Sequence, residues 1–508
     1  MELDATQLPD RHVIETDLCV VGTGPAGIVL AREFLGSGIH VTMLESGGLQ
    51  FNPSIQQLNE GVTVGDPCAN PKLTRHRQVG GTVNIWNTVV GTEPGAKYVP
   101  LDEIDFEARP GMEMDGWPFD RCHLQPFYCR AQTLCGLGTF DYDAHRWTDA
   151  GHSPLPLTGD HLTTKIYQFG PARVFTETYV RDLRQADNIS VCYNANVVAL
   201  ETDVRGQRVV GARVACLGGS GFYVKAKTFV LAAGGIENAR LLLLSNQYWP
   251  EGLGNRYGWV GRCFMEHPRD YSLTLIPRDH HLLGEAAFYA PHSVSGVIVM
   301  GRLALRQEAM RQDRLPNMSV TLLPQPKEAL LVSALGLDRF WGRRRRFPRS
   351  YADWSVAGKR SRRFREVRLL INLEQLPSRE NRIALSRKRD ALGLPQVEIH
   401  WRWRQLDERN LERLRAIVIS ELEQSNLGRV EFEPGIRPDP NAHHHAGTTR
   451  MHIDPCQGVV DENSRVHGVE NLFVTGSSTF PTAGFANPTL TVVALALRLA
   501  DCLKRGTI

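Results

Sequence analysis

The chain has 508 residues, of which 42% are hydrophobic and 8% aromatic, a composition typical of a globular protein with a large core. A chain of this length folds as roughly two to four domain-sized units. The net charge of +3, from 58 basic and 55 acidic side chains, argues against nucleic acid as the main partner. There is no apolar run long enough to span a bilayer, and no apolar signal region follows the acidic start Met1–Asp4. We therefore expect a cytoplasmic protein with no nucleic-acid partner and no membrane span. The sequence does not decide between a monomer and a homo-oligomer.

Ten cysteines in a chain this long do not form a disulfide framework. Cys122, Cys129 and Cys135 lie closest together, but their spacings match neither a zinc pair nor a common iron–sulfur motif. Cys122 and Cys129 are seven residues apart and would share one face of a helix. We expect these cysteines to be core residues, with a metal site as the less favoured alternative.

The N-terminal region has the pattern strand, turn, helix, strand. Residues 17–21 form a short apolar run, and residues 26–35 have helical spacing that stops at Gly36-Ser37-Gly38. Residues 39–44 then form a second apolar run. This βαβ beginning is what a dinucleotide-binding fold requires.

The turn between the first strand and the helix carries the glycines of a dinucleotide site. Gly22 permits the tight turn, Gly24 the close approach of a pyrophosphate, and Gly27 the packing of helix on strand. The phosphates would sit at the positive helix N-terminus. Glu45, after the second strand, would accept hydrogen bonds from the adenosine ribose.

A second dinucleotide site is missing from the sequence, which favours FAD over NAD. The other glycine cluster, residues 218–221, lies between the short strands 213–216 and 222–225 and therefore predicts a hairpin loop. Residues 229–233 predict a buried strand, and residues 236–245 predict a helix. Because no nicotinamide site accompanies the first motif, we expect the electrons to come from the substrate.

Polar motifs gather near the C-terminus. Residues 441–451 read Asn-Ala-His-His-His-Ala-Gly-Thr-Thr-Arg-Met, residues 471–477 read Asn-Leu-Phe-Val-Thr-Gly-Ser, and residues 486–491 read Ala-Asn-Pro-Thr-Leu-Thr. Before them, residues 335–368 are rich in arginine and tryptophan. That segment predicts a solvated surface loop or, as the sharper alternative, a docking patch for a membrane surface or an acidic partner.

With these motifs, the chain resembles the glucose–methanol–choline (GMC) oxidoreductases, and most closely their bacterial sugar-oxidising branch near pyranose oxidases and glucoside 3-dehydrogenases. Three internal stretches, residues 80–86, 231–238 and 261–268, are also similar to that family. The resemblance implies His444 as the catalytic base and Asn487 as the second catalytic residue. For FAD binding, the motifs and the resemblance together indicate Gly22, Gly24, Pro25, Ala26, Gly27, Glu45, Ser46, Gly80, Gly81, Thr82, Asn84, Val197, Ala233, Gly476, Ser477, Asn487 and Thr489.

The chemistry of alcohol oxidation suits these residue types. An imidazole that titrates near neutrality can remove the hydroxyl proton while a hydride leaves the carbon, and an amide can donate to the developing alkoxide. Asn487 precedes a predicted helix over residues 488–503, with Pro at its first position. The positive end of that helix would favour negative charge on the reduced flavin.

The neighbouring histidines have plainer interpretations. His443, His444 and His445 form a histidine triplet. Adjacent side chains in this triplet do not converge on one metal ion, and no spaced acid or cysteine completes a ligand set, so we expect no metal. His443 and His445 are expected to be structural or to face the substrate. His267 and Glu266 are expected to be packing and hydrogen-bonding residues.

One position departs from the resemblance. Pyranose oxidases that attach FAD covalently carry a histidine just before the Trp of the flavin loop, and this chain has Ile85 there. We therefore expect non-covalent FAD.

The expected fold is α/β (α+β overall), with a Rossmann-like FAD-binding domain that is discontinuous in sequence and a sheet-and-helix substrate-binding cap. Residues 1–95, 165–275 and 440–508 would form the FAD-binding domain, and residues 96–164 and 276–439 the substrate-binding domain.

The expected activity is FAD-dependent oxidation of an alcohol group on a sugar, glycoside or aminoglycoside-like molecule, with O2 or another compound as electron acceptor. The alternatives are non-oxidative flavin chemistry, such as a lyase or photodecarboxylase reaction, and a binding or maturation partner without turnover.

Overall fold

The computed structural model describes residues 1–109, 112, 114, 116–279, 282, 286–326 and 364–506. The part of the Arg-rich segment between residues 335 and 363 lies outside them, and residues 364–368 belong to a strand of the cap. Within the described ranges, no helix is both long and apolar enough to cross a bilayer.

In the described chain, eight strands form a sheet whose centre is parallel. Its order is β1-β8-β3-β2-β11-β10-β9, with β20 paired to β11. β2 runs parallel to both β3 and β11, whereas β10 and β9 form an antiparallel extension. The bounds are β1 (Glu2–Asp4), β8 (Ile189–Tyr193), β3 (Val41–Leu44), β2 (Val13–Val21), β11 (Gly221–Leu231), β10 (Val209–Ala215), β9 (Asn196–Thr202) and β20 (Leu472–Val474).

A second sheet has nine strands within the described residues and is antiparallel where its registers are defined. Its order is β19-β12-β16-β15-β14-β7-β6-β5, with β13 on β14. The bounds are β19 (Gly428–Phe432), β12 (Arg269–Pro277), β16 (Phe364–Leu373), β15 (Met318–Pro326), β14 (Val297–Leu305), β7 (Leu162–Pro171), β6 (Glu93–Tyr98), β5 (Thr88–Val90) and β13 (His292–Val294).

A small third sheet and the helices complete the described fold. The sheet has the order β17 (Arg382–Arg389), β18 (Pro395–Trp401), β4 (Gly61–Gly65). The helices are α1 (Pro25–Arg32), α2 (Pro53–Gln56), α3 (Pro71–Thr74), α4 (Arg121–Leu134), α5 (Tyr179–Gln185), α6 (Gly234–Leu244), α8 (Gln307–Asp313), α11 (Gln405–Gln424) and α12 (Thr489–Gly506).

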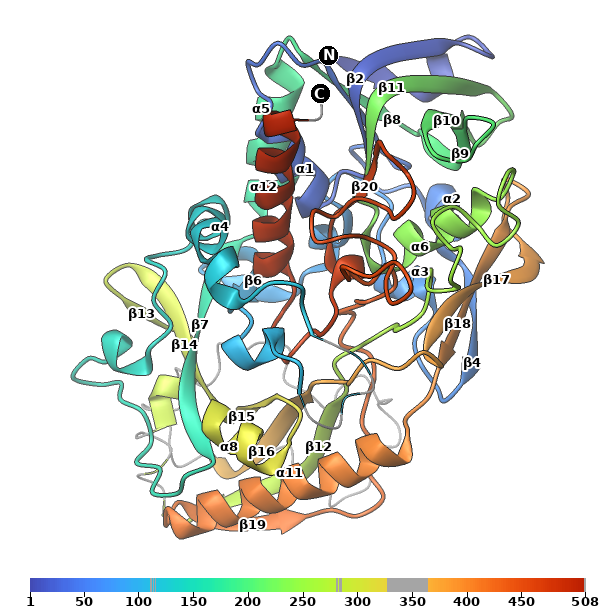
Figure 1. Cartoon of the computed structure of the whole chain (residues 1–508). Helices are drawn as coiled ribbons and strands as arrows, with labels where there is room; N and C mark the ends of the chain where they lie inside the picture. The colour runs from blue at the N-terminus through green and yellow to red at the C-terminus, as the bar shows by residue number, and fades with distance from the viewer. Residues whose placement is uncertain are drawn as a thin grey trace.

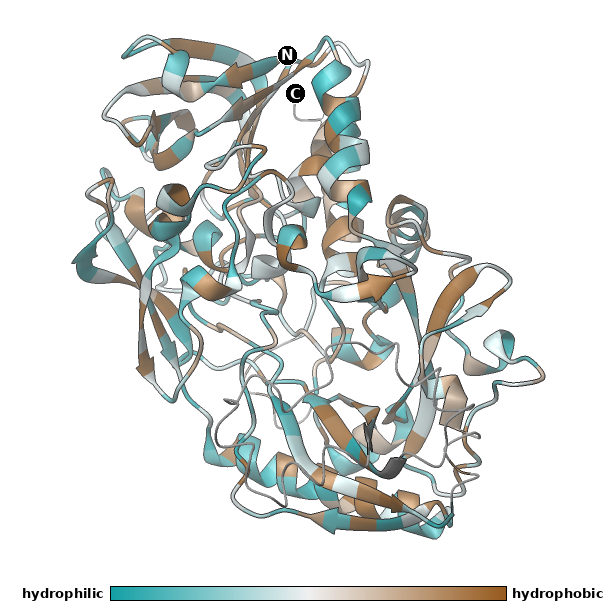
Figure 2. Ribbon diagram, turned by 180° about the vertical axis from the view of Figure 1, so that it is seen from behind, coloured by the Kyte–Doolittle hydropathy of each residue, from teal (hydrophilic) through white to brown (hydrophobic). Residues whose placement is uncertain are grey.

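The two large sheets lie at opposite ends of the molecule. In Figure 1 the parallel sheet and α12 are at the top, and the nine-stranded sheet is at the bottom, together with α11. Apolar side chains of α11, among them Leu411, Leu414 and Val418, pack in one core with the strands of that sheet. Figure 2 shows apolar and polar segments along the same helices, as expected where only one face of a helix is buried. The predicted α/β fold with a sheet-and-helix cap is confirmed.

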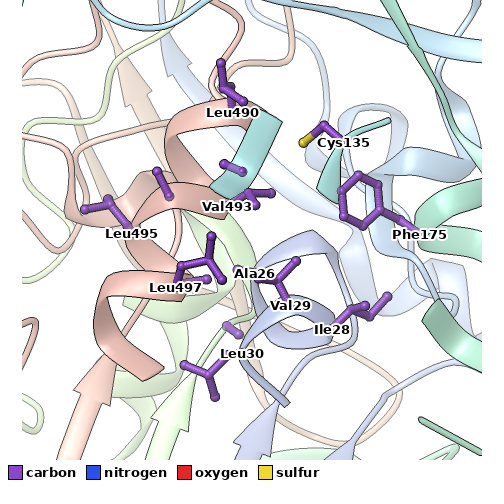
Figure 3. Close-up of a cluster of buried hydrophobic side chains, with 14 of the residues drawn as sticks. Ala26, Ile28, Val29, Leu30, Cys135, Phe175, Leu490, Val493, Leu495 and Leu497 are labelled. Atoms are coloured by element: carbon purple, nitrogen blue, oxygen red, sulfur yellow. The ribbon is translucent and has the colours of Figure 1, made fainter. Parts of the chain in front are cut away.

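The first and last helices of the chain pack against each other. Figure 3 shows Ala26, Val29 and Leu30 of α1 beside Leu490, Val493 and Leu497 of α12, and all six side chains are buried in one core cluster. The N-termini of α1 and α12 belong to the two segments where sequence predicted cofactor and catalytic residues. The packing of these helices therefore fixes those two segments relative to each other.

Several local predictions differ from the structure in their limits. The first helix ends at Arg32, not at residue 35, because the next amides tighten into i→i−3 bonds, with Phe34 donating to Ala31 and Leu35 to Arg32. The strand predicted over 229–233 ends at Leu231. The hairpin around residues 217–221 is confirmed by the antiparallel pairing of β10 with β11.

The interpretation of Cys122 and Cys129 as core residues is wrong. Both lie on α4 and are exposed, whereas Cys135, which caps that helix, is buried. The seven-residue spacing does place both thiols on one face, but that face points to solvent. No group of three or more His, Cys, Asp or Glu side chains in the described residues is arranged to hold a metal ion.

Candidate active site

The glycine turn joins β2 to α1 at the carboxyl end of the parallel sheet, where ligands bind in folds of this kind. Gly22 has a φ of 105°, and a Cβ there would lie 2.7 Å from the carbonyl oxygen of Ala232. A Cβ on Gly27 would lie 2.0 Å from the carbonyl oxygen of Gly22. Both positions thus require glycine for packing, as the sequence predicted.

Gly24 is different, because a Cβ built on it would meet nothing within 4 Å. It is the N-cap of α1, and no side chain caps this helix. The backbone N–H groups of the first turn are therefore free to bind an anionic ligand, and the helix dipole favours one. This open, uncapped turn fits the pyrophosphate of a dinucleotide.

Glu45 is buried and already oriented by the protein. One carboxylate oxygen accepts hydrogen bonds from the backbone N–H of Thr23 at 3.1 Å and from its hydroxyl at 2.6 Å. The other accepts from the backbone N–H of Gly47 at 2.9 Å and from the Ser46 hydroxyl at 3.3 Å. The glycine turn and the residue after β3 therefore form one connected unit.

The loop after residue 79 covers the glycine turn. The backbone N–H of Gly80 donates to the carbonyl of Thr23 at 2.9 Å, and a Cβ on Gly81 would lie 3.3 Å from the Cα of Gly24. The Asn84 side chain donates to the carbonyls of Val79 and Gly81. In this arrangement Asn84 shapes the loop.

Three segments far apart in the sequence meet beside this turn. The Thr448 hydroxyl donates to the carbonyl of Gly235 at 2.6 Å, and the amides of Gly447, Thr449 and Met451 donate to the carbonyls of residues 477–479. The Asn238 side chain accepts from Ala233 and donates to Ser478. Residues 231–238, 444–451 and 475–479 are thus tied by hydrogen bonds.

The histidine triplet begins at a left-handed backbone position. His443 has a φ of 63°, in a region that is uncommon outside glycine but that His adopts more readily than most side chains. Beyond it, the backbone N–H of His444 donates to one carboxylate oxygen of Glu266 at 3.0 Å, and Nε2 of His445 lies 3.1 Å from the other. Burial would raise the pKa of the Glu266 carboxyl, but the charge of His445 and its hydrogen bond lower the pKa below its usual value.

His444 is half-buried and lies between two polar side chains. Its Nδ1 is 2.9 Å from Nδ1 of His267, and its Nε2 is 3.1 Å from Nδ2 of Asn487. Burial lowers the pKa of His444 well below its usual value, and the nearby His267 and Lys97 lower it further. At neutral pH this imidazole is uncharged, as a general base must be.

One pocket connects the glycine turn with the triplet. Of the residues assigned from sequence, the pocket is lined by Gly22, Gly24, Pro25, Ala26, Glu45, Ser46, Gly81, Thr82, Val197, Ala233, His444, Gly476, Ser477 and Thr489. Gly27, Gly80, Asn84 and Asn487 support it from outside the lining. The pocket is also lined by residues that the sequence assignment left out, namely Asn59, Arg75, Arg77, Trp86, Glu237, His443 and His445.

His267 and Glu266 were undervalued by the sequence interpretation. Both are buried and bond directly to the triplet, since Met265 and Ala446 form a β-bridge that brings the two segments together. The similarity of residues 261–268 to the bacterial members was the signal that could have identified them.

Comparisons with known proteins agree with this site. The family model described as GMC oxidoreductase matches residues 377–496. The chain is 25% identical to the 6'''-hydroxyparomomycin C oxidase of Streptomyces lividus, over 96% of this chain and 91% of that protein. It is also 25% identical to the fructose dehydrogenase large subunit of Gluconobacter japonicus, over 98% of this chain and 100% of that protein.

The fold is also similar to that of a solved relative. The formate oxidase of Aspergillus oryzae RIB40 matches with a TM-score of 0.56 and 16% identity, over 98% of this chain and 99% of that one. The resemblance predicted from the motifs is therefore confirmed, and the open glycine turn fits the expected cofactor. The GMC oxidoreductase match lies in residues 377–496, the chain is similar to sugar and aminoglycoside oxidoreductases over nearly its whole length, and it is an FAD-dependent oxidoreductase.

Proposed function

We propose that this enzyme oxidises a CH–OH group of a sugar, glycoside or aminoglycoside-like small molecule. The observation that carries the proposal is the pairing of His444 with Asn487 at 3.1 Å, at the end of the pocket that begins with the glycine turn. The names of the relatives, an aminoglycoside oxidase and a fructose dehydrogenase, support the substrate class.

His444 is the proposed base. Its Nδ1 is occupied by His267, so Nε2 is the atom left to receive the hydroxyl proton of the substrate. Because burial holds the ring neutral, Nε2 can accept that proton without first losing one. The C–H bond breaks in the same reaction, and a carbonyl forms.

Asn487 is the proposed second catalytic residue. Its side-chain amide is a donor and carries no charge, so it can bind the substrate oxygen without competing for the proton. It directly precedes Pro488 and the first turn of α12, and Thr489 of that turn lines the pocket. The positive end of a helix near the site favours developing negative charge.

The proposed cofactor contacts follow the pocket. The free amides at the start of α1 would hold the pyrophosphate, and Glu45 would receive the ribose hydroxyls. Thr82 and Ser477 line the stretch toward His444. FAD, when bound there, supplies a two-electron acceptor for the hydride. Ile85 carries no nucleophile, which supports non-covalent binding.

The neighbours of the base have supporting roles. Glu266 binds the backbone N–H of His444 and the ring of His445, and so fixes the orientation of these two histidines. The Ser477 hydroxyl donates to the carbonyl of His445 at 2.7 Å and ties the triplet to the pocket wall. His443 and His445 line the pocket and are proposed to be structural or to face the substrate.

An anaerobic screen tests the proposal. The holoenzyme is mixed with sugars, glycosides, aminoglycosides and simple alcohols, and the visible flavin absorbance is followed. Bleaching by members of these classes is expected. If no alcohol bleaches the flavin but light releases CO2 from a carboxylic acid, the photodecarboxylase alternative replaces the proposal. Admission of oxygen after bleaching then distinguishes O2 from another acceptor.

Further predictions accompany this function. We propose O2 or another compound as the electron acceptor and a cytoplasmic location. We also propose that residues 1–95, 165–275 and 440–508 form an FAD-binding domain, and that residues 96–164 and 276–439 form a substrate domain. A homo-oligomer stays open.

A further inference from the structure

The imidazoles of His444 and His267 meet edge to face. Their ring centroids are 5.0 Å apart, the planes are inclined by 79°, and the two Nδ1 atoms are 2.9 Å apart. His267 is fully buried, and His444 is half-buried. His267 comes just before Pro268 and β12, whereas His444 comes from the loop between β19 and β20.

A hydrogen bond between two Nδ1 atoms requires one proton, and burial keeps both rings neutral by lowering the pKa of each. A neutral imidazole has a single ring proton, so the donor in this bond has an unprotonated Nε2 and the acceptor carries its proton on Nε2. Only two arrangements are therefore available, and the surroundings of the two Nε2 atoms decide between them.

At His444, the atom that faces Nε2 is a donor. Nδ2 of Asn487 lies 3.1 Å away, which suits an unprotonated Nε2 whose lone pair accepts from this amide until a substrate hydroxyl takes its place. If Nε2 of His444 carried the proton, two N–H groups would face each other at that distance. An unsatisfied buried donor costs on the order of 1–3 kcal/mol.

At His267, the surroundings are acceptors. Burial lowers the pKa of His267, while the charges of Glu266 and Glu374 and then the backbone carbonyls of Ala483 and Gly484 raise it. Nε2 makes no well-aligned hydrogen bond, and Nδ1 is occupied by His444, so Nε2 is the atom these carbonyls favour as a proton carrier.

Both ends of the pair thus favour the same arrangement. We propose that His267 is a positioning residue that accepts a hydrogen bond from Nδ1 of His444 and thereby keeps the lone pair of His444 on Nε2, where the substrate hydroxyl is bound. This inference rests on the proposed role of His444 as base. It gives His444 an uncharged partner, where many catalytic histidines have a carboxylate.

An uncharged partner has a specific consequence for the base. A carboxylate beside Nδ1 would favour the imidazolium and raise the pKa of the base. An imidazole acceptor orients the ring and fixes the proton on Nδ1 with no such charge. His267 therefore controls which nitrogen is basic and leaves the basicity to burial and to the charges nearby.

Nitrogen NMR of the holoenzyme tests the tautomer directly. Ring-15N-labelled histidine is incorporated, and the His444 signals are identified by their loss in His444→Gln. In the wild type, His444 is expected to show a protonated Nδ1 and a lone pair on Nε2. A protonated Nε2 on His444 in the wild type overturns the proposal, and this measurement does not depend on finding a substrate.

Two substitutions test the consequence for turnover. His267→Phe removes the acceptor and is expected to move the proton of His444 to Nε2 and to slow anaerobic flavin reduction at least about 10-fold, with substrate affinity little changed. His267→Gln offers a carbonyl oxygen to Nδ1 and is expected to restore most of the rate. Equal rates in the wild type and His267→Phe, or equal loss in both variants, reject the positioning role.

His292→Phe is the matched control. His292 is also a buried histidine of the cap, with Nδ1 bonded to the carbonyl of Ala290 and Nε2 without a partner, and it stacks on His152. It should lose stability comparable to His267→Phe and keep its flavin-reduction rate. If no alcohol reduces the wild-type flavin, the proposed function fails, while the NMR result on His444 still decides the tautomer.

Discussion

Nε2 of His444 and Nδ2 of Asn487 lie 3.1 Å apart, although 43 residues separate them in the chain. His444 belongs to the loop that follows β19, and Asn487 to the segment that leads into α12. The pairing depends on the hydrogen bonds between residues 447–451 and 477–479, which hold the two neighbouring segments side by side. A substrate hydroxyl that reaches both side chains meets an acceptor and a donor together.

Replacement of His444 by Ala should slow flavin reduction by a factor of order 10² or more, because the hydroxyl proton loses its acceptor. FAD should stay bound, since the imidazole is only one of many groups that line the pocket. Stopped-flow mixing under anaerobic conditions measures the rate, and the exposed His145→Ala serves as control. An unchanged reduction rate in His444→Ala would reject this residue as the base.

Asn487→Asp preserves the shape of the side chain and adds a negative charge beside Nε2 of His444. The charge should raise the pKa of His444, because a nearby carboxylate favours the imidazolium. The reduction rate should fall by about 10- to 1,000-fold, since the donor to the alkoxide is lost, and its acid limb should move to higher pH. Rate profiles against pH for the two proteins check this, and an acid limb that does not move contradicts the contact.

The pH dependence of the wild type follows from the neutral base. Burial, with His267, Lys97 and Arg269 nearby, lowers the pKa of His444 well below its usual 6.5. The neutral form therefore persists as the pH falls below 6.5, and the reduction rate should decline only when the pH passes through the lowered value. Lys97→Met removes a positive charge and should move that decline to higher pH. A decline centred at or above 6.5 in the wild type would contradict the burial argument.

The glycine turn offers a pair of substitutions with different outcomes. Gly24→Val places its side chain in space that is open in the protein, so the Tm of the apoprotein should change little. FAD binding should weaken at least about 10-fold, because the side chain would keep the backbone from approaching the pyrophosphate. Gly27→Ala drives a Cβ toward the carbonyl of Gly22 and should cost roughly 1–3 kcal/mol of stability. Fluorescence titration with FAD and thermal unfolding separate the two effects. Equal loss of Tm in both variants would contradict the difference between the sites.

The flavin should leave the protein when the fold is lost. Ile85 stands where covalent pyranose oxidases carry a histidine, and its side chain cannot form the bond. Precipitation with acid or heat should release free yellow flavin into the supernatant, where absorbance measures it. Flavin that remains with the washed pellet would show a covalent link and reject the prediction.

The sequence predicted the local parts of the fold well. The βαβ beginning, the hairpin before residue 222 and the last helix follow from short-range patterns of apolar residues and glycine. The limits of α1 were missed because a tightened last turn depends on hydrogen bonds that composition does not reveal. Cys122 and Cys129 were missed because a spacing of seven identifies a shared face but not the side of the helix that is buried.

The site was predicted where a motif carries its own chemistry. His444 and Asn487 come from motifs with a family resemblance, and they lie in hydrogen-bond contact. His267 and Arg75 could not be placed in the same way. The contact of His267 with His444 arises from a β-bridge between Met265 and Ala446, across 177 residues from one histidine to the other, and no periodicity predicts such a bridge.

The packing of α1 on α12 has a consequence for biosynthesis. The glycine turn is translated before β20, which pairs with β11, and before α12, which covers α1. A nascent chain that stops before residue 472 lacks Gly476, Ser477 and Thr489, and so lacks one wall of the pocket. We therefore expect FAD to bind only after these segments have been made, since they complete the pocket.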